Sequence, residues 1–325
     1  MADPIGTENS SGGQSRKPYV HLALLLLTFL STSIAGVQWL NKDPFEISNF
    51  TNGLTYGILI LAILLAHELG HFIAAKAHHV EVSLPYFIPF PSFFGLAPFG
   101  TLGALIRIRS SINSKRVLFD IGVAGPIAGF LASLFILIVG FSNLPQIDYL
   151  YSIHPEYANM AQLPDGGLTF GLNLTFALFR MLIPLPGSFI PPMNEVYHYP
   201  YLCVGWFGLF VTALNLIPVG QLDGGHITRA MFANSHQRIG QASLIVMAIL
   251  GTLGILPTLG VKVAVGWIGW LIWGILLGVF FYRRKVDPIP LPGDERLGAI
   301  RNILGWACII IFALSFTPVP FGGLD

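Results

Sequence analysis

Two histidines and a glutamate lie close together in the stretch AHELGH, residues 66–71. On a helix, His67 and His71 are one turn apart, so both imidazoles project from the same face and can hold a single Zn²⁺. Glu68 lies beside them and can take a proton from a water molecule that the metal activates. The spacing therefore indicates metal-dependent hydrolysis. The alternative is two helix histidines that only find hydrogen-bond partners.

The motif follows directly on an apolar run, GILILAILL, at residues 57–65. Of the 325 residues, 54% are hydrophobic and only 10% are charged, whereas soluble domains average about 25% charged residues. The chain is therefore predicted to be a polytopic membrane protein. An ionisable group inside a span is costly and points to function, which disfavours the hydrogen-bond alternative. The net charge of +1 argues against a nucleic-acid partner.

Apolar stretches of about 20 residues mark the membrane spans. We expect an all-α fold with about seven transmembrane helices, at roughly 19–39, 54–77, 117–141, 201–222, 240–259, 262–282 and 299–316. The expected organisation is a disordered tail (1–18), a first helix with an outer loop (19–53), a catalytic core (54–240) and C-terminal helices (241–325). Cys203 and Cys308 lie in different apolar segments and are interpreted as packing residues.

Positive charge predicts the orientation of these spans. With seven spans, all but three of the 17 Lys and Arg residues fall on the side that holds the N-terminus; the three are Lys42, Arg180 and Lys262. Cytoplasmic loops carry the excess of positive charge, so the N-terminus is predicted to be cytoplasmic and the C-terminus outside. A bacterial plasma membrane is the expected location, with an organelle membrane as the alternative. His67 and His71 then lie in the cytoplasmic half of the second span.

A catalytic zinc ion usually has three protein ligands and one open position, so a third ligand must reach the depth of His71. Asp223, in the stretch NLIPVGQLDGGH, is the acidic residue that best meets this condition. Pro218 breaks the fourth span, and the neighbouring glycines let the backbone bend. Asp120, at the start of the third span, is a weaker rival. Asp223 could instead serve only as a helix cap.

The pair of motifs, HELGH at residues 67–71 and N-x-x-P-x-x-x-L-D-G at residues 215–224, resembles the site-2 protease family of intramembrane zinc metalloproteases. The resemblance covers about residues 54–240. It implies that His67, His71 and Asp223 bind one Zn²⁺ and that Glu68 is the general base and acid. Asn215 would donate a hydrogen bond to the scissile carbonyl or oxyanion, or else only bond a neighbouring helix.

Residues 80–116 contain four prolines and no helical stripe, and GTLGALIRIR ends in the alternation typical of a strand. They are predicted to form a re-entrant hairpin. In the family, a GT-x-G-A stretch forms a membrane-embedded β-hairpin, which could pair with an unwound substrate or only cover the site. The small residues of GVAGPIAGF, residues 122–130, are interpreted as a packing face. The outer loop 142–200 looks too short for a PDZ domain.

The leading hypothesis is a zinc endopeptidase that cuts a single-pass transmembrane substrate within the lipid bilayer. A zinc transporter with the same residues as a transit site is the first alternative, although the sequence shows no internal repeat of the kind that carriers have. A membrane zinc protease that uses a Glu ligand in place of Asp223 is the second alternative.

Overall fold

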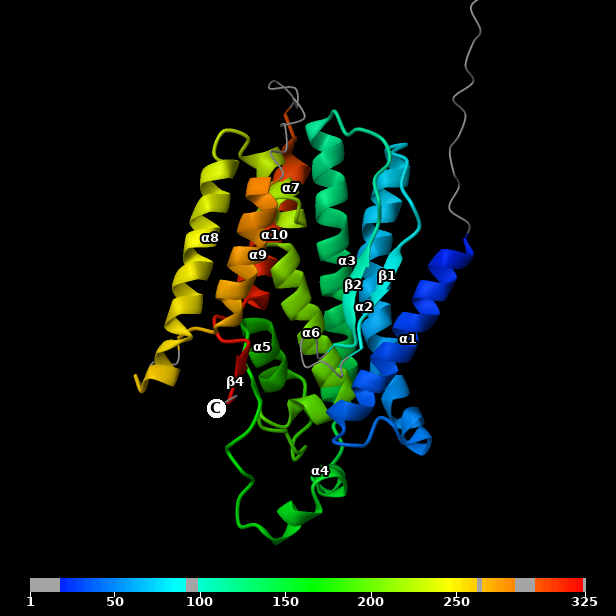
Figure 1. Cartoon of the computed structure of the whole chain (residues 1–325), viewed down its shortest axis with the longest axis vertical. Coiled ribbons are helices and arrows are strands. Elements are labelled where there is room, and N and C mark those ends of the chain that lie inside the picture. Colours follow the sequence, from blue (N-terminus) through cyan, green and yellow to red (C-terminus); the bar gives the residue numbers. More distant parts are fainter. Residues whose placement is uncertain (1–17, 92–98, 262–264, 284–295, 324–325) are drawn as a thin grey trace, which may run out of the picture.

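The structure, a computed structural model of the chain, describes residues 18–91, 99–261, 265–283 and 296–323. The predicted disordered tail, residues 1–18, lies outside the described residues except for Pro18. The described part is mostly helical, and its long helices run roughly along one common axis (Figure 1). This agrees with the expected all-α membrane fold, because helices satisfy their own backbone hydrogen bonds where water is absent.

Three helices are long and apolar enough to cross a membrane: α1 (Tyr19–Trp39), α2 (Phe50–Ala77) and α3 (Lys115–Ser142), with the short turn η1 (Ile47–Asn49) leading into α2. Their bounds match the first three predicted spans closely. Ser114 caps α3, because its side chain accepts a hydrogen bond from the backbone N–H of Val117. Pro126 lies inside α3 without ending it.

The other helices are shorter than the predicted spans. α6 (Pro200–Asn215) and α10 (Ala299–Ser315) are apolar, as is the greater part of α9 (Gly269–Arg283). α8 (His236–Leu253) is followed by the turn η5 (Leu256–Leu259), and residues 262–264, where the sixth span was expected to begin, lie outside the described residues. The described helices therefore support a membrane protein with three long spans, and the count of seven stays a prediction.

The fourth predicted span, 201–222, is helical only as far as residue 215, and the break expected at Pro218 comes slightly earlier. α6 ends at Asn215, and after an irregular stretch the chain starts a new helix, α7 (Asp223–Met231). Pro218 cannot donate a backbone hydrogen bond to a preceding turn, and Gly220 has φ of +58°, a conformation that favours glycine. The break turns the chain so that Asp223 begins its own helix.

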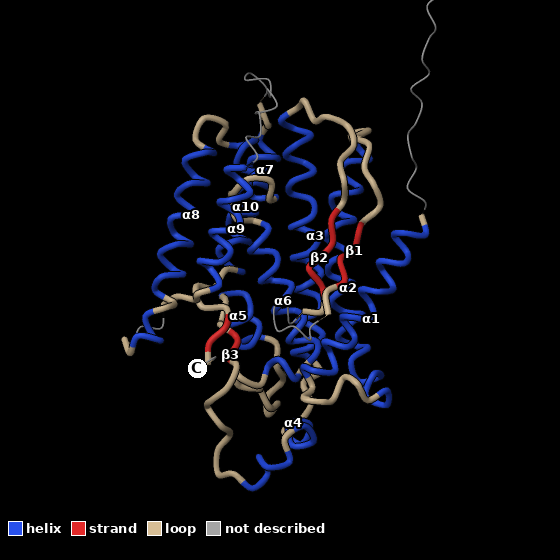
Figure 2. The backbone as a smooth tube through the Cα atoms, viewed as in Figure 1, coloured by secondary structure: helices blue, strands red, loops and turns tan. Residues whose placement is uncertain are grey.

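The hairpin after α2 has two antiparallel strands, β1 (Tyr86–Pro89) and β2 (Thr101–Leu105), with a bulge between Phe87 and Pro89 (Figure 2). Residues 92–98, its tip, lie outside the described residues. His21 of α1 joins the hairpin to the bundle, because its Nδ1 lies 3.0 Å from the carbonyl oxygen of Pro85. The predicted hairpin is thus present beside α1 and α2.

Residues 142–200, all of which are described, form α4 (Asp148–Ile153), η3 (Pro155–Asn159), β3 (Thr169–Phe170), α5 (Leu174–Leu182) and η4 (Val196–His198). This is not the fold of a PDZ domain, in agreement with the prediction. The strand β3 pairs with β4 (Phe321–Gly322), near the C-terminus. The sequence analysis did not predict this second small sheet.

The main core surrounds α6. Trp206, Phe207 and Leu209 of this helix are completely buried and pack against residues of α2 and α3. Cys203 and Cys308 are both buried and free, which fits their interpretation as packing residues. Because α6 is held on several sides, the position of the loop that follows it is fixed by packing.

Candidate metal centre

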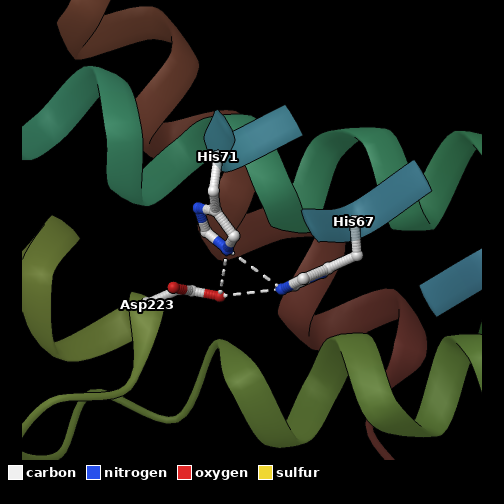
Figure 3. Close-up of side chains that lie close together, drawn as sticks. All are labelled: His67, His71 and Asp223. Carbon is white, nitrogen blue, oxygen red and sulfur yellow. Dashed lines mark hydrogen bonds and ion pairs between the residues drawn. The ribbon is translucent and has the colours of Figure 1, made fainter. Parts of the chain in front are cut away.

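His67, His71 and Asp223 come together in the structure, although the third residue is far from the other two in sequence (Figure 3). The Nε2 atoms of the two histidines are 3.1 Å apart. Oδ2 of Asp223 lies 3.3 Å from Nε2 of His67 and 3.4 Å from Nε2 of His71. Both histidine rings are about nine-tenths buried. The three residues therefore present one ligand atom each to a common, shielded point.

This arrangement suits a zinc ion. Nitrogen and oxygen ligands at 2.0–2.2 Å from a tetrahedral Zn²⁺ are roughly 3.3–3.5 Å from one another, close to the three distances found. Nδ1 of His71 lies 2.7 Å from the carbonyl oxygen of Ile121. A carbonyl only accepts hydrogen bonds, so Nδ1 carries the proton and Nε2 keeps its lone pair for a metal. Two imidazole nitrogens and a carboxylate oxygen that meet in a buried place are a suitable set of ligands for a cation.

Helix α3 lies against the two histidines through its glycines. A Cβ atom on Gly125 would overlap the ring of His71, and one on Gly129 would lie 3.2 Å from Nδ1 of His67. The four-residue spacing of these glycines matches that of the histidines on the antiparallel α2. The sequence analysis interpreted the stretch as a packing face. The structure shows in addition that this face packs directly on the proposed zinc ligands.

Asp223 reaches the centre from the first turn of α7, and its carboxylate faces the histidines rather than the helix end. The N-cap position of α7 is Leu222, and no side chain caps this helix. The alternative role of Asp223 as a helix cap is therefore not what the structure shows. Gly224 and Gly225 follow it, and a Cβ on either would overlap backbone carbonyl oxygens of residues 216–220. Only glycine allows the turn before Asp223 to fold this tightly against α7.

Asp120, the rival third ligand, is engaged elsewhere. Its two carboxylate oxygens each accept a hydrogen bond of 2.7 Å from Arg301 of α10. The second oxygen also lies 2.8 Å from Nε2 of His78. The carboxylate thus joins the ends of three helices and takes no part in the metal centre.

Glu68 is buried beside the two histidines. The backbone of Ile106, the residue that follows β2, lies close to its carboxylate. The hairpin therefore contacts the residue predicted to be the general base, which the sequence analysis did not foresee. Asn215 is the last residue of α6 and is half-buried. Among the described residues its amide has no hydrogen-bond partner.

These motifs and their geometry match a known family. The profile of peptidase family M50 matches residues 55–256. The chain belongs to peptidase family M50. The matched region contains α2 from residue 55 onward, the hairpin, α3, α6 and α7, and so contains every residue of the metal centre. The resemblance to site-2 proteases, proposed from the two motifs, is thereby confirmed.

Curated relatives of this M50 protein carry names in accord with the site. It is 31% identical over 271 residues to "Probable zinc metalloprotease EGY1, chloroplastic" of Arabidopsis thaliana, a match that covers 82% of this chain and 42% of the relative. It is 28% identical over 300 residues to "Probable zinc metalloprotease EGY2, chloroplastic" of Oryza sativa subsp. indica, covering 91% and 48% respectively. The chain thus spans about half the length of the curated relatives it matches.

Proposed function

We propose that this M50 protein is an intramembrane zinc endopeptidase that hydrolyses a peptide bond in a transmembrane segment of a membrane protein. The observation that carries the proposal is the buried group of His67, His71 and Asp223 with Glu68 next to it on the same helix. Two imidazoles and one carboxylate leave an open position on a four-coordinate zinc, as catalytic sites require.

Bound zinc would act as a Lewis acid that lowers the pKa of water and polarises the scissile carbonyl. Glu68 accepts the proton of the attacking water and later donates it to the leaving amine. The Ile106 backbone lies close to this carboxylate and helps to hold it beside the ligands. The amide of Asn215 is left to donate to the oxyanion that develops on the substrate.

The substrate would approach through the hairpin side of the molecule. A shallow apolar groove of about 270 Å³ lies between α1 and the end of β1, lined by Leu27, Leu30, Ser31, Ile34, Pro89 and Pro91. In β2, Leu102 and Leu105 are exposed. A substrate helix must unwind before cleavage, and an adjacent strand can bond the backbone groups that unwinding releases. The hairpin is therefore our proposed guide for the unwound segment.

We propose the orientation that the positive charges predict, with the N-terminus and the end of α2 that bears His71 on the cytoplasmic side. His67 and His71 are nearer to this end of α2 than to its start, so water has the shorter path to the metal centre from this side. A bacterial plasma membrane stays a prediction. The relatives whose names include "chloroplastic" make an organelle membrane, with the corresponding orientation, the alternative to test.

The proposal is tested by reconstituting the full chain in liposomes with single-pass reporter peptides labelled at both ends. Half of the peptides would carry a helix-destabilising Asn-Pro pair at the expected depth of His67 and His71. We expect the wild type to cut the peptides with this pair. The Glu68→Gln variant should cut none and bind as much zinc, whereas Glu46→Gln, on an exposed turn, should cut normally. Cleavage by Glu68→Gln would contradict the mechanism.

The same liposomes address the transporter alternative. A zinc-sensitive dye inside them would report zinc entry. Entry that depends on His67 and Asp223, without cleavage of any reporter peptide, would overturn the protease proposal in favour of transport.

A further inference from the structure

A second cluster of metal-ligating side chains lies in the loop 142–200, at the opposite end of the bundle from α7 (Figure 1). It consists of His154, directly after α4, together with Glu195 and His198 around η4. One ligand atom from each lies within 4.8 Å of those of the other two. Glu195 and His198 are both 2% exposed. Neither the two motifs nor the family match accounts for this cluster.

Hydrogen bonds fix the direction of both imidazoles. Nδ1 of His198 lies 2.6 Å from the carbonyl oxygen of Trp39, at the end of α1. Nδ1 of His154 lies 3.0 Å from a carboxylate oxygen of Glu156. Both partners are acceptors, so each Nδ1 carries a proton and each Nε2 is left with its lone pair. This is how metal-binding histidines are usually oriented by their neighbours.

The two Nε2 atoms then face each other at 3.0 Å. Two lone pairs at this distance repel unless a cation lies between them or one ring takes a second proton. A metal ion satisfies both nitrogens, because ligands of a tetrahedral zinc are roughly 3.3–3.5 Å apart. The corresponding distance between His67 and His71 is 3.1 Å. The outer pair therefore repeats the spacing found at the metal centre of the M50 site.

Glu195 supplies the negative charge. One of its oxygens accepts a hydrogen bond from the hydroxyl of Tyr157. The other, Oε2, is buried, accepts no hydrogen bond from any residue that the structure describes, and lies 3.5 Å from Nε2 of His198. Leaving a buried carboxylate oxygen without a partner is costly. A cation held between Oε2 and the two imidazoles removes that cost.

We propose that His154, Glu195 and His198 form a second metal site, for Zn²⁺ or a similar divalent transition ion. Two imidazoles and one carboxylate favour such ions over Mg²⁺ and Ca²⁺, which prefer oxygen ligands. The site joins residues 154–157 to the start of α6 and, through the Trp39 carbonyl, to α1. Its role is structural, because its ligands hold separate segments of the chain together, and a fourth position on a four-coordinate ion would be left to water. The proposal does not rest on the proposed protease activity.

The test is the metal content of the full chain in detergent after loading with zinc and removal of the excess. Bound metal per chain is compared between the wild type and His198→Ala. It is also compared between Asp223→Ala and Asp223→Ala/His198→Ala. We expect a loss of about one equivalent in each background. Asp165→Asn, an exposed substitution in the same loop, is the matched control and should lose none.

A second measurement identifies the ligands. Loaded with Co²⁺, the Asp223→Ala protein should show visible d–d absorption that disappears in Asp223→Ala/His198→Ala. If His198→Ala does not fold, His154→Ala takes its place, because the His154 ring is more exposed than the His198 ring. Retained cleavage of the reporter peptides by His198→Ala would show that its metal loss is not general unfolding. If His198→Ala changes the metal content in neither background, the proposal is overturned. The short distance between the two rings would then be explained by a proton that they share.

Discussion

Gly125 of α3 lies directly against the imidazole of His71 on α2, so closely that a methyl group on the glycine would overlap the Nε2 atom that faces Asp223. The backbone of α3 therefore forms one wall of the metal centre. The same helix also supplies the Ile121 carbonyl that orients the His71 ring. The geometry of the M50 site is thus set by how near α3 can approach α2, and glycine permits the approach.

Substitution of Gly125 by alanine should weaken metal binding. The added methyl group must push the His71 ring away or separate the two helices, and overpacking of this kind costs about 1–3 kcal/mol. We expect the affinity for zinc to fall roughly 10- to 100-fold, the size of effect typical of disturbed ligand orientation. Competition with a calibrated chelator would measure the change.

Two other glycines provide the comparison. Gly129→Ala places its methyl group 3.2 Å from the His67 ring, so a smaller loss is expected. Gly278, in α9, has nothing within 4 Å of an added Cβ, so Gly278→Ala should bind zinc normally. Equal affinities in all three variants would show that α3 does not hold the ligands in place.

Alanine variants of Asp223 and Asp120 should differ in zinc content, because only Asp223 is among the three metal ligands. Asp223→Ala removes one of the three ligands, and the protein should lose its active-site zinc and its cleavage of the reporter peptides. Asp120→Ala should keep that zinc, because its carboxylate is bound to Arg301 and His78. The number of zinc ions bound per chain, measured for both variants, tests this expectation. Full active-site zinc in Asp223→Ala would favour a protease with a different third ligand.

Asn215 should affect turnover more than metal content. If its amide donates to the developing oxyanion, Asn215→Ala lowers kcat by about 10²- to 10³-fold, with little change in KM. Zinc content should stay at the wild-type value, since Asn215 is not among the three ligands. Asn302→Ala, an exposed position in α10, is the control. A fall in thermal stability without a change in kcat would instead indicate a structural asparagine.

Arg301 should stabilise the packing of α10 on α3. Both of its hydrogen bonds to Asp120 are 2.7 Å long and come from a planar fork that lysine lacks. Arg301→Lys should lower the free energy of unfolding by about 1–3 kcal/mol. Thermal unfolding in detergent would report a lower Tm for Arg301→Lys and an unchanged one for Asn302→Ala. An unchanged Tm in both would show that the pair contributes nothing.

Several features of the fold were predictable from local sequence. α1 was expected at 19–39 and is found at Tyr19–Trp39, because the length of an apolar run follows the thickness of the membrane. His67 and His71 share a helix face by their spacing alone. The break near Pro218 was expected from the chemistry of proline, yet the helix ended earlier, at Asn215. The sequence could not predict how long the irregular stretch would be.

Other features depend on residues that are distant in the chain. The sequence indicated that Gly125 and Gly129 lie on a packing face but not which helix they meet. The cluster of His154, Glu195 and His198 joins positions of which two are 44 residues apart. The approach of the Ile106 backbone to Glu68 depends on how the hairpin lies on α2. Local patterns contain no information on these distances.

The sequence by itself determined a helical membrane chain and a His-Glu-x-x-His face on its second helix, and it favoured Asp223 over its rival Asp120 as the third ligand. Those properties follow from hydrophobic length, helix periodicity and the ligand chemistry of zinc, which act within a few turns. Only the tertiary structure decided that Asp120 is bound by Arg301, that α3 touches the ligands and that a second cluster forms in the loop 142–200. Each of these rests on packing between segments, where a difference of about one methyl group decides which atoms meet.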